Sequence, residues 1–263
     1  MTAVGVDGLT IRAGQRVLLD NVSVSASAGE CIAIAGPNGA GKSTLLRTLA
    51  GLIPQQGRVR LNGQNIQMMS LRQRARLAAY LPQQTVLHWP VSIAAAVLIG
   101  RAPYGYAGGS PSPQDKAALD HALAETGLTD LAARRVDTLS GGERARVAFA
   151  RFLVSEAPVL LADEPIAALD AGYQVSVLAS LARLAREGRC VICVLHDLTL
   201  AARWATRAIL MHRGLIAADG PTSEVMTASG LEAVYQTPFT HAIVEGKPVI
   251  APSRDPRGAG SLS

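Results

Sequence analysis

A glycine-rich loop that ends in lysine and serine offers the clearest chemistry in this chain. Its residues fit the G-x-x-x-x-G-K-S spacing of a phosphate-binding loop: Gly36-Pro37-Asn38-Gly39-Ala40-Gly41-Lys42-Ser43-Thr44. Glycines let the backbone curl so that successive N–H groups face phosphate oxygens, which a Cβ would obstruct. Lys42 adds a positive charge for the β- and γ-phosphates, and the Ser43 hydroxyl can ligate Mg²⁺. A glycine-rich turn before a helix is the plain alternative, but the Lys-Ser ending favours a nucleotide-phosphate site.

Two carboxylates supply a second set of chemical groups. They follow an apolar run that predicts a buried strand over Val159–Ala162. We expect Asp163 to hold Mg²⁺ opposite Ser43, and Glu164 to orient and polarise the attacking water as a general base. Paired acids are also common at solvated strand ends, so the metal interpretation depends on the phosphate loop elsewhere in the chain.

A third candidate, Leu139-Ser140-Gly141-Gly142-Glu143, precedes an amphipathic pattern and predicts the start of a helix. Ser140 and Glu143 have the spacing of a capping box, which is the ordinary explanation. The alternative is a second helix N-terminus that faces phosphate, with glycines giving close access to the backbone. Capping boxes are common, so the spacing alone favours the ordinary explanation.

These residues need a framework of strands and helices to bring them together. A strand over 31–35 and a helix over 42–50, ended by Gly51, are predicted on either side of the phosphate loop. Short alternating stretches over 4–24 predict an antiparallel β layer before it. Strands alternate with helices after residue 159, which predicts an α/β fold with a mostly parallel sheet and right-handed crossovers.

We expect a single domain over residues 1–250. Helical, alanine-rich segments predict a helical subdomain of about 84–156, inserted into a core of about 1–83 and 157–250. Residues 251–263 are rich in Pro, Gly, Ser and charge, and are expected to form a disordered tail.

Composition narrows the class of protein. Hydrophobic residues make up 49% of the chain and aromatic residues 4%, which is typical of an aliphatic α/β core. The net charge of +5 could suit nucleic acid, but Lys and Arg form no run longer than a pair and are not interleaved with aromatics, so no nucleic-acid partner is expected. No apolar run approaches the roughly 20 residues of a membrane-spanning helix. Without a secretion signal either, the sequence predicts a soluble cytosolic protein that can dock on a membrane partner.

Three cysteines, Cys31, Cys190 and Cys193, suggest a reducing compartment. The last two have a C-x-x-C spacing, but they lie in an apolar run that predicts a strand. An offset of three places their sulfurs on opposite faces of a strand, which disfavours metal or redox work. We therefore interpret all three as small buried hydrophobic residues.

Taken together, these motifs resemble the ATP-binding subunits of ATP-binding cassette (ABC) transporters, over about residues 4–225. The family signature LSGGQ matches Leu139–Glu143, and the other elements follow in the family's order. Gln83 matches the Q-loop glutamine, Ala167-Ala168-Leu169-Asp170 the D-loop, and His196 the switch histidine. A lone histidine after an apolar strand is usually a polar strand-end residue, and only its place after the paired acids suggests this role.

The resemblance implies ATP as the nucleotide, Mg²⁺ as the metal and a head-to-tail homodimer. In such a dimer the nucleotide on one phosphate loop is covered by the signature residues of the other copy, Ser140, Gly141, Gly142 and Glu143. The resemblance also implies that Glu164 is the general base and that His196 holds the γ-phosphate. Gln83 would contribute to the Mg²⁺ site and pass changes there to a membrane partner.

That partner would be a polytopic permease, with a substrate-binding protein acting indirectly. The chain would then lie peripherally on the cytoplasmic face of the cell membrane. In this family the permease is met by the segment between Gln83 and the signature, which here contains Trp89-Pro90 and Gly100–Gly105. This stretch is similar to ATPases of importers of iron–siderophore complexes, haem or cobalamin, so we expect one of these cargoes, an iron complex first. Trp89-Pro90 can also be explained as a turn with a packed aromatic.

Two positions depart from the family pattern. The opening β layer usually carries an aromatic residue that stacks on adenine, but Ala13 stands there. We expect adenine to rest instead on aliphatic groups such as Val17, with Arg12 or Arg16, and discrimination between ATP and GTP to be weak. The signature ends in Glu143 where Gln is commonest, which places an extra negative charge near the dimer interface.

Two other classes stay open. A soluble ABC ATPase without a permease, such as an iron–sulfur cluster assembly ATPase, has a similar length, but the stretch from Gln83 to Tyr104 argues against it. Translation and repair ATPases of the family generally carry two cassettes, or zinc and coiled-coil insertions, which this sequence lacks. A simple P-loop kinase would not need Leu139–Glu143.

Overall fold

The phosphate loop follows an inner strand of a six-stranded sheet in this computed structural model, which describes residues 1–84, 90–167 and 169–253. The strand order is β10-β9-β3-β8-β7-β6, and neighbours pair in parallel except β9 with β10. The strands span Cys31–Ala35 (β3), Ala78–Leu81 (β6), Val159–Asp163 (β7), Cys190–Val194 (β8), Arg207–His212 (β9) and Leu215–Pro221 (β10). Every residue of β3, β7 and β8 is buried, as continuous apolar runs predict.

A second, antiparallel sheet covers one face of the first. Its order is β2-β1-β4-β5, with strands Thr2–Ala13 (β1), Arg16–Ser27 (β2), Gln56–Leu61 (β4) and Gln64–Asn65 (β5). Inner-face residues such as Val4 and Leu61 share one buried cluster with helix α1 (Lys42–Leu49) and with Ile32 of β3. The helix after the phosphate loop is therefore held between two sheets, and the predicted antiparallel layer on a parallel core is confirmed.

The opposite face of the central sheet packs against helices α6 (Ala171–Arg186) and α7 (Leu198–Trp204). Along β8, Cys190 faces the antiparallel layer and Cys193 faces the helices, as the offset of three requires. All three cysteines are free and buried, and burial raises the pKa of the Cys190 thiol to about 12. Their interpretation as buried hydrophobic residues agrees with this placement.

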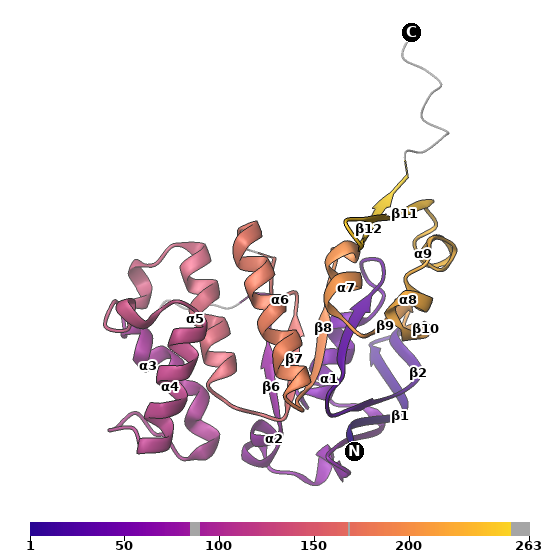
Figure 1. Cartoon of the computed structure of the whole chain (residues 1–263). Coiled ribbons are helices and arrows are strands. Elements are labelled where there is room, and N and C mark those ends of the chain that lie inside the picture. Colours follow the sequence, from indigo (N-terminus) through magenta and orange to yellow (C-terminus); the bar gives the residue numbers. More distant parts are fainter. Residues whose placement is uncertain (85–89, 168, 254–263) are drawn as a thin grey trace.

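Further helices gather at one side of the central sheet, beyond β6 and α6 (Figure 1): α3 (Ile93–Leu98), α4 (Pro113–Glu125) and α5 (Gly141–Leu153). Each starts after a serine whose hydroxyl accepts a backbone N–H three residues on: Ser92, Ser112 and Ser140. The guanidinium of buried Arg101 joins this region together, because it lies 2.8 Å from the Asp115 carboxylate and 2.7 Å from that of Glu156. Shorter helical segments are α2 (Leu71–Leu77) and the 3₁₀ turns Ile66–Met68, Ile99–Tyr104, Thr129–Leu131 and Val136–Thr138.

The last described segment packs against β9, β10 and α7. It contains α8 (Thr222–Val225), α9 (Ala228–Tyr235) and a hairpin of β11 (Phe239–Val244) and β12 (Lys247–Pro252). The expectation of a disordered tail from residue 251 is wrong for Ala251 and Pro252, because both are paired within this hairpin. Ser253 of that tail is also held, because its N–H donates to the Pro238 carbonyl oxygen at 2.8 Å, and residues 254–263 lie outside the described residues. Among the described residues, no helix combines the length and apolar character needed to cross a membrane.

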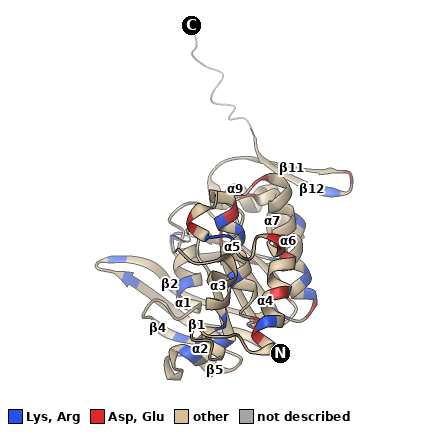
Figure 2. Ribbon diagram, turned by 90° about the vertical axis from the view of Figure 1, so that its left-hand side faces the viewer, with Lys and Arg blue, Asp and Glu red and all other residues tan. Residues whose placement is uncertain are grey.

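Charged residues of both signs are interspersed over the helices in the view of Figure 2. The same view shows basic residues at the tip of the hairpin formed by β1 and β2, which reaches out from the body of the protein. This mixture suits the interpretation of the net positive charge as a solvated surface.

Candidate active site

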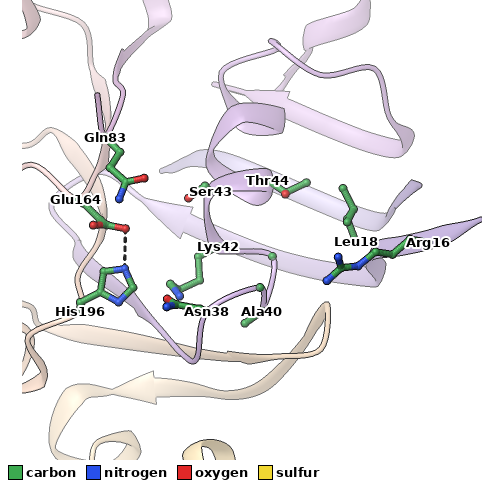
Figure 3. Close-up of a pocket in the computed structure, with 12 residues that line it drawn as sticks. Arg16, Leu18, Asn38, Ala40, Lys42, Ser43, Thr44, Gln83, Glu164 and His196 are labelled. Atoms are coloured by element: carbon green, nitrogen blue, oxygen red, sulfur yellow. Dashed lines mark hydrogen bonds and ion pairs between the residues drawn. The ribbon is translucent and has the colours of Figure 1, made fainter. Parts of the chain in front are cut away.

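A cavity of about 710 Å³ lies over the phosphate loop (Figure 3). It brings the loop together with all three predicted catalytic residues, Gln83, Glu164 and His196, which come from the ends of β6, β7 and β8. Because these are adjacent parallel strands, their carboxyl ends meet at one edge of the sheet. The loop residues that line the cavity are Asn38, Gly39, Ala40, Gly41, Lys42, Ser43 and Thr44.

The start and end of the loop explain why glycine is needed there. Gly36 has a φ of +143°, and a Cβ on it would lie 2.1 Å from the carbonyl oxygen of Met211 on β9. Gly41 has a φ of +102°, directly before α1 begins, and a Cβ there would lie 2.8 Å from the carbonyl oxygen of Leu18. Both positions therefore combine a left-handed backbone with close contact to a neighbouring strand.

Lys42 lies folded against its own loop, and only 6% of the residue is exposed. Its Nζ donates hydrogen bonds to the carbonyl oxygens of Gly36 (2.7 Å) and Pro37 (3.0 Å). Burial lowers the pKa of Lys42, while the carboxylates of Glu164 and Asp163 raise it in opposition. The ammonium group is thus held inside the curl of the loop, at the base of the cavity.

The serine and the acid predicted to share a metal already touch. Ser43 Oγ donates to Asp163 Oδ1 at 2.9 Å, and Asp163 is fully buried. Tyr80, which belongs to none of the motifs, is also bound here: its hydroxyl donates to the other carboxylate oxygen of Asp163 at 3.2 Å and accepts from Arg47 Nε at 3.3 Å. A hydroxyl and a carboxylate are oxygen ligands of the kind that Mg²⁺ prefers, so these residues fit the expected ion.

Glu164 and His196 form a close pair at the cavity wall. His196 Nε2 lies 2.6 Å from Glu164 Oε1, drawn as the dashed line in Figure 3. The Glu164 side chain is 15% exposed and that of His196 is 45% exposed. Glu164 also has a φ of +52°, an uncommon value for a residue with a Cβ, and its N–H donates to Val194 on β8 at 3.2 Å. Such backbone strain at a strand end is typical of functional sites.

Gln83 lies where β6 runs out into the cavity. Figure 3 shows its carboxamide on the same side as Ser43 and Glu164. Trp89, which is expected to lie in the segment that meets the permease, falls outside the described residues, as do residues 85–88. Ala168 of the expected D-loop is also outside them. Asp170 of that loop accepts a hydrogen bond from the backbone of Tyr173 and starts α6.

The signature residues Ser140, Gly141, Gly142 and Glu143 do not line this cavity. The predicted capping box is present: Glu143 N–H donates to Ser140 Oγ (3.2 Å) and Ser140 N–H donates to Glu143 Oε2 (2.8 Å). Ser140 and Gly141 remain exposed at the start of α5. Glu143 also lies 2.9 Å from the Arg134 guanidinium, so its extra negative charge is compensated within the chain. Hydrogen bonds from Ser140, first its backbone N–H, lower the pKa of Glu143.

The far end of the cavity differs from the expected base platform. Arg16 and Leu18 of β2 line it, whereas Val17 and Arg12 do not. Successive side chains of a strand point to opposite faces, so Arg16 and Leu18 lie on one face of β2 and Val17 lies on the other. Figure 3 shows both across the loop from Glu164 and His196. The cavity lining therefore offers Leu18, and not Val17, as an aliphatic surface, and contact with adenine stays a prediction.

Comparisons with known proteins agree with this geometry. A family model described as ABC transporter matches residues 19–167. The hemin import ATP-binding protein HmuV of Streptomyces coelicolor is 46% identical, over 95% of this chain and 89% of that protein. Relatives of the same name from other bacteria are 38–46% identical.

Two solved structures extend the likeness to the fold. A metal-chelate type ABC transporter in an inward-facing conformation is 26% identical with a TM-score of 0.82, over 97% of this chain and 99% of that one. A dimeric bacterial ABC transporter cassette, MJ0796, is 25% identical with a TM-score of 0.74, over 83% and 98%. The chain therefore belongs to the ABC transporter family, as an ATP-binding subunit with ATPase activity.

Proposed function

We propose that this ATPase energises the uptake of haem through a membrane permease. The observation that carries the cargo is the shared description of the relatives as hemin import proteins, at up to 46% identity over most of both chains. These relatives carry the hemin description and not that of siderophore or cobalamin importers, which the sequence also resembles. An iron-containing cargo is common to the expectation from the sequence and to the description of these relatives.

In the proposed reaction the ATP phosphates lie on the N–H groups of the phosphate loop. Lys42 turns from the carbonyls of Gly36 and Pro37 towards the β- and γ-phosphates, which it can reach from its place in the loop. Ser43 and Asp163 would hold Mg²⁺, with Gln83 beside them. When bound, the ion neutralises charge that develops on the phosphates.

Glu164 then accepts a proton from the attacking water, as a general base at the cavity wall. The bond between His196 and Glu164 (2.6 Å) gives that carboxylate a fixed orientation before nucleotide arrives. With ATP present, His196 can donate to the γ-phosphate instead, because it lines the cavity and 45% of its side chain is exposed.

A second copy of the chain completes the site. Ser140 and Gly141 are exposed and lie outside the cavity of their own chain, so they are available to the nucleotide of another subunit. A helix N-terminus with two glycines suits such a phosphate contact. The likeness to a dimeric ABC cassette supports a head-to-tail homodimer.

The permease is proposed to dock beside Gln83. A largely apolar groove of about 360 Å³ lies there, between the end of β6 and the helical side of the molecule. Tyr80, Pro82, Ile99 and Phe152 are among its lining residues. Docking here would place the chain peripherally on the cytoplasmic face of the membrane, with the substrate-binding protein on the other side.

Reconstitution tests this proposal. The chain is purified with its permease in proteoliposomes, and ATP hydrolysis is measured with binding proteins loaded with haem, ferric siderophore or cobalamin. Stimulation by the haem-loaded protein alone is expected, and stimulation only by another cargo would overturn the haem assignment. Capture of soluble cluster-assembly proteins in place of a permease would overturn import itself.

A further inference from the structure

The last helix of the chain touches the first residue of the phosphate loop. The Tyr235 hydroxyl at the end of α9 accepts a hydrogen bond from the Gly36 N–H at 2.8 Å, across 199 residues of sequence. Tyr235 is partly buried, and this burial raises the pKa of its phenol, which therefore stays neutral at physiological pH. None of the motifs of the sequence analysis includes this residue.

The contact is one of three that fix the Gly36 peptide. The Gly36 N–H donates to the Tyr235 hydroxyl, and the Gly36 carbonyl oxygen accepts from Lys42 Nζ at 2.7 Å. The Gly36 Cα faces the Met211 carbonyl so closely that a Cβ would lie 2.1 Å from its oxygen. The beginning of the loop is thus held from α9, from its own lysine and from β9. Lys42 must leave when phosphate binds, whereas Tyr235 lies outside the cavity lining and can stay.

Tyr235 belongs to a segment that we name the C-terminal clasp, residues 228–252, and other residues of this segment hold its side chain in place. Its ring meets the Phe239 ring edge-on, with centroids 5.5 Å apart. Phe239 begins β11 and pairs with Pro252 of β12. The clasp therefore places the phenol through packed aromatic rings and a paired hairpin.

The other end of the clasp is fastened to α7, which begins two residues after His196. Thr199 Oγ1 donates to the Ile250 carbonyl and accepts from the Ile250 N–H, both at 2.9 Å. Arg203 Nε donates to the Pro248 carbonyl at 2.9 Å. One segment thus bridges the phosphate loop and the helix that follows the switch histidine.

We propose that Tyr235 is a positioning residue for the phosphate loop, acting through the Gly36 N–H. This inference goes beyond haem import and rests only on ATP binding at the loop. Without the phenol oxygen, the Gly36 N–H loses its acceptor and the loop start can adopt other conformations. ATP then binds only the curled fraction, and its apparent Kd rises in inverse proportion to that fraction.

The test is Tyr235→Phe in the full chain, which keeps the ring on Phe239 and removes only the oxygen. The Kd for a fluorescent ATP analogue with Mg²⁺, and the KM for ATP, are expected to rise about three- to tenfold, as for a lost buried hydrogen bond. The kcat is expected to stay within about twofold, because Glu164 and His196 are untouched. Amide hydrogen exchange should quicken in peptides covering 36–41 and stay unchanged in β8.

A matched control is Tyr173→Phe, which likewise removes a tyrosine hydroxyl bonded to the backbone, here one that donates to the Thr126 carbonyl oxygen at 3.3 Å. Its Kd for ATP should equal that of the wild type. Phe239→Leu keeps the phenol but loosens its support, and should give an intermediate Kd. All variants are compared well below their unfolding temperatures, so that loss of fold does not enter.

An unchanged Kd and unchanged exchange in Tyr235→Phe would overturn the proposal. A fall of about three- to tenfold in kcat with no change in KM would also overturn it. A wild-type chain that binds ATP but gives no haem-stimulated hydrolysis would refute only the haem assignment. The two failures are therefore distinguishable.

Discussion

Replacing Glu164 by glutamine tests the proposed chemistry most directly, because the change removes a base and little else. Glutamine has the same shape and its amide oxygen can still accept a hydrogen bond from His196 Nε2, now 2.6 Å from the carboxylate. The positive φ of +52° costs the same for both residues, since neither is glycine. We therefore expect an unchanged fold, with a free energy of unfolding within about 0.5 kcal/mol of the wild type.

The hydrolysis rate should respond far more strongly. Loss of a general base typically slows a reaction by about 10²–10⁴-fold, which corresponds to about 3–5 kcal/mol of activation free energy. ATP binding should not weaken, because a negative charge is removed from the wall that faces the phosphates. The apparent Kd should fall by at most about fivefold, the effect of roughly 1 kcal/mol for a partly exposed charge.

Single-turnover hydrolysis of labelled ATP gives the rate, and size-exclusion chromatography with ATP and Mg²⁺ shows whether the variant accumulates as a dimer. His196→Ala provides the comparison. It should slow hydrolysis, because His196 is proposed to hold the γ-phosphate during the reaction, and it should leave the Kd for ATP within about threefold of the wild type. Turnover by Glu164→Gln at the wild-type rate would sink the general-base role. A Glu164→Gln chain that no longer binds ATP would mean that the side chain is structural.

Three further predictions concern the phosphate loop and the recognition of the nucleotide base. Lys42→Ala should raise the Kd for ATP by at least about tenfold, as the loss of a charge-assisted phosphate contact implies, and an unchanged Kd in calorimetry would contradict the phosphate loop. Gly39→Ala should lower the free energy of unfolding in urea by about 1 kcal/mol for its left-handed backbone, but Gly36→Ala by more than about 3 kcal/mol, because its Cβ also meets Met211; equal losses would contradict the close contact between the loop and β9. Arg16→Ala should weaken ATP and GTP alike by about two- to tenfold in competition binding, and a strong wild-type preference for ATP would refute the predicted weak discrimination.

Local signals explain what the sequence made predictable. The strand before the phosphate loop and the helix after it follow from an apolar run and from Gly51, within about twenty residues of each other. Ser140 was recognisable as a helix cap because capping depends on residues three apart. The roles of Glu164 and His196 were predictable only through the order of motifs in the family that the sequence resembles. Their meeting in one cavity follows because the parallel strands before them end at one edge of the sheet.

Contacts between distant segments could not be read in the same way. Tyr80 lies beside Asp163 only because β6 pairs with β7, and the sequence does not state which strands are neighbours. Tyr235 of α9 contacts Gly36 across 199 residues of sequence, and no local pattern states that contact. The side of β2 that faces the cavity depends on a register with β1 that shifts along its length, so the sequence alone does not show that Leu18, and not Val17, lines the cavity.

The signature shows how one short motif can satisfy two requirements. Ser140 and Glu143 cap α5 within their own chain, and Arg134 compensates the glutamate charge, so the helix start is stable without nucleotide. That stability leaves Ser140 and Gly141 exposed in a fixed arrangement, outside the cavity of their own chain. A preformed surface of this kind lowers the entropic cost of closing on a second subunit. The cap and the proposed phosphate contact are therefore complementary, because the first prepares the geometry that the second requires.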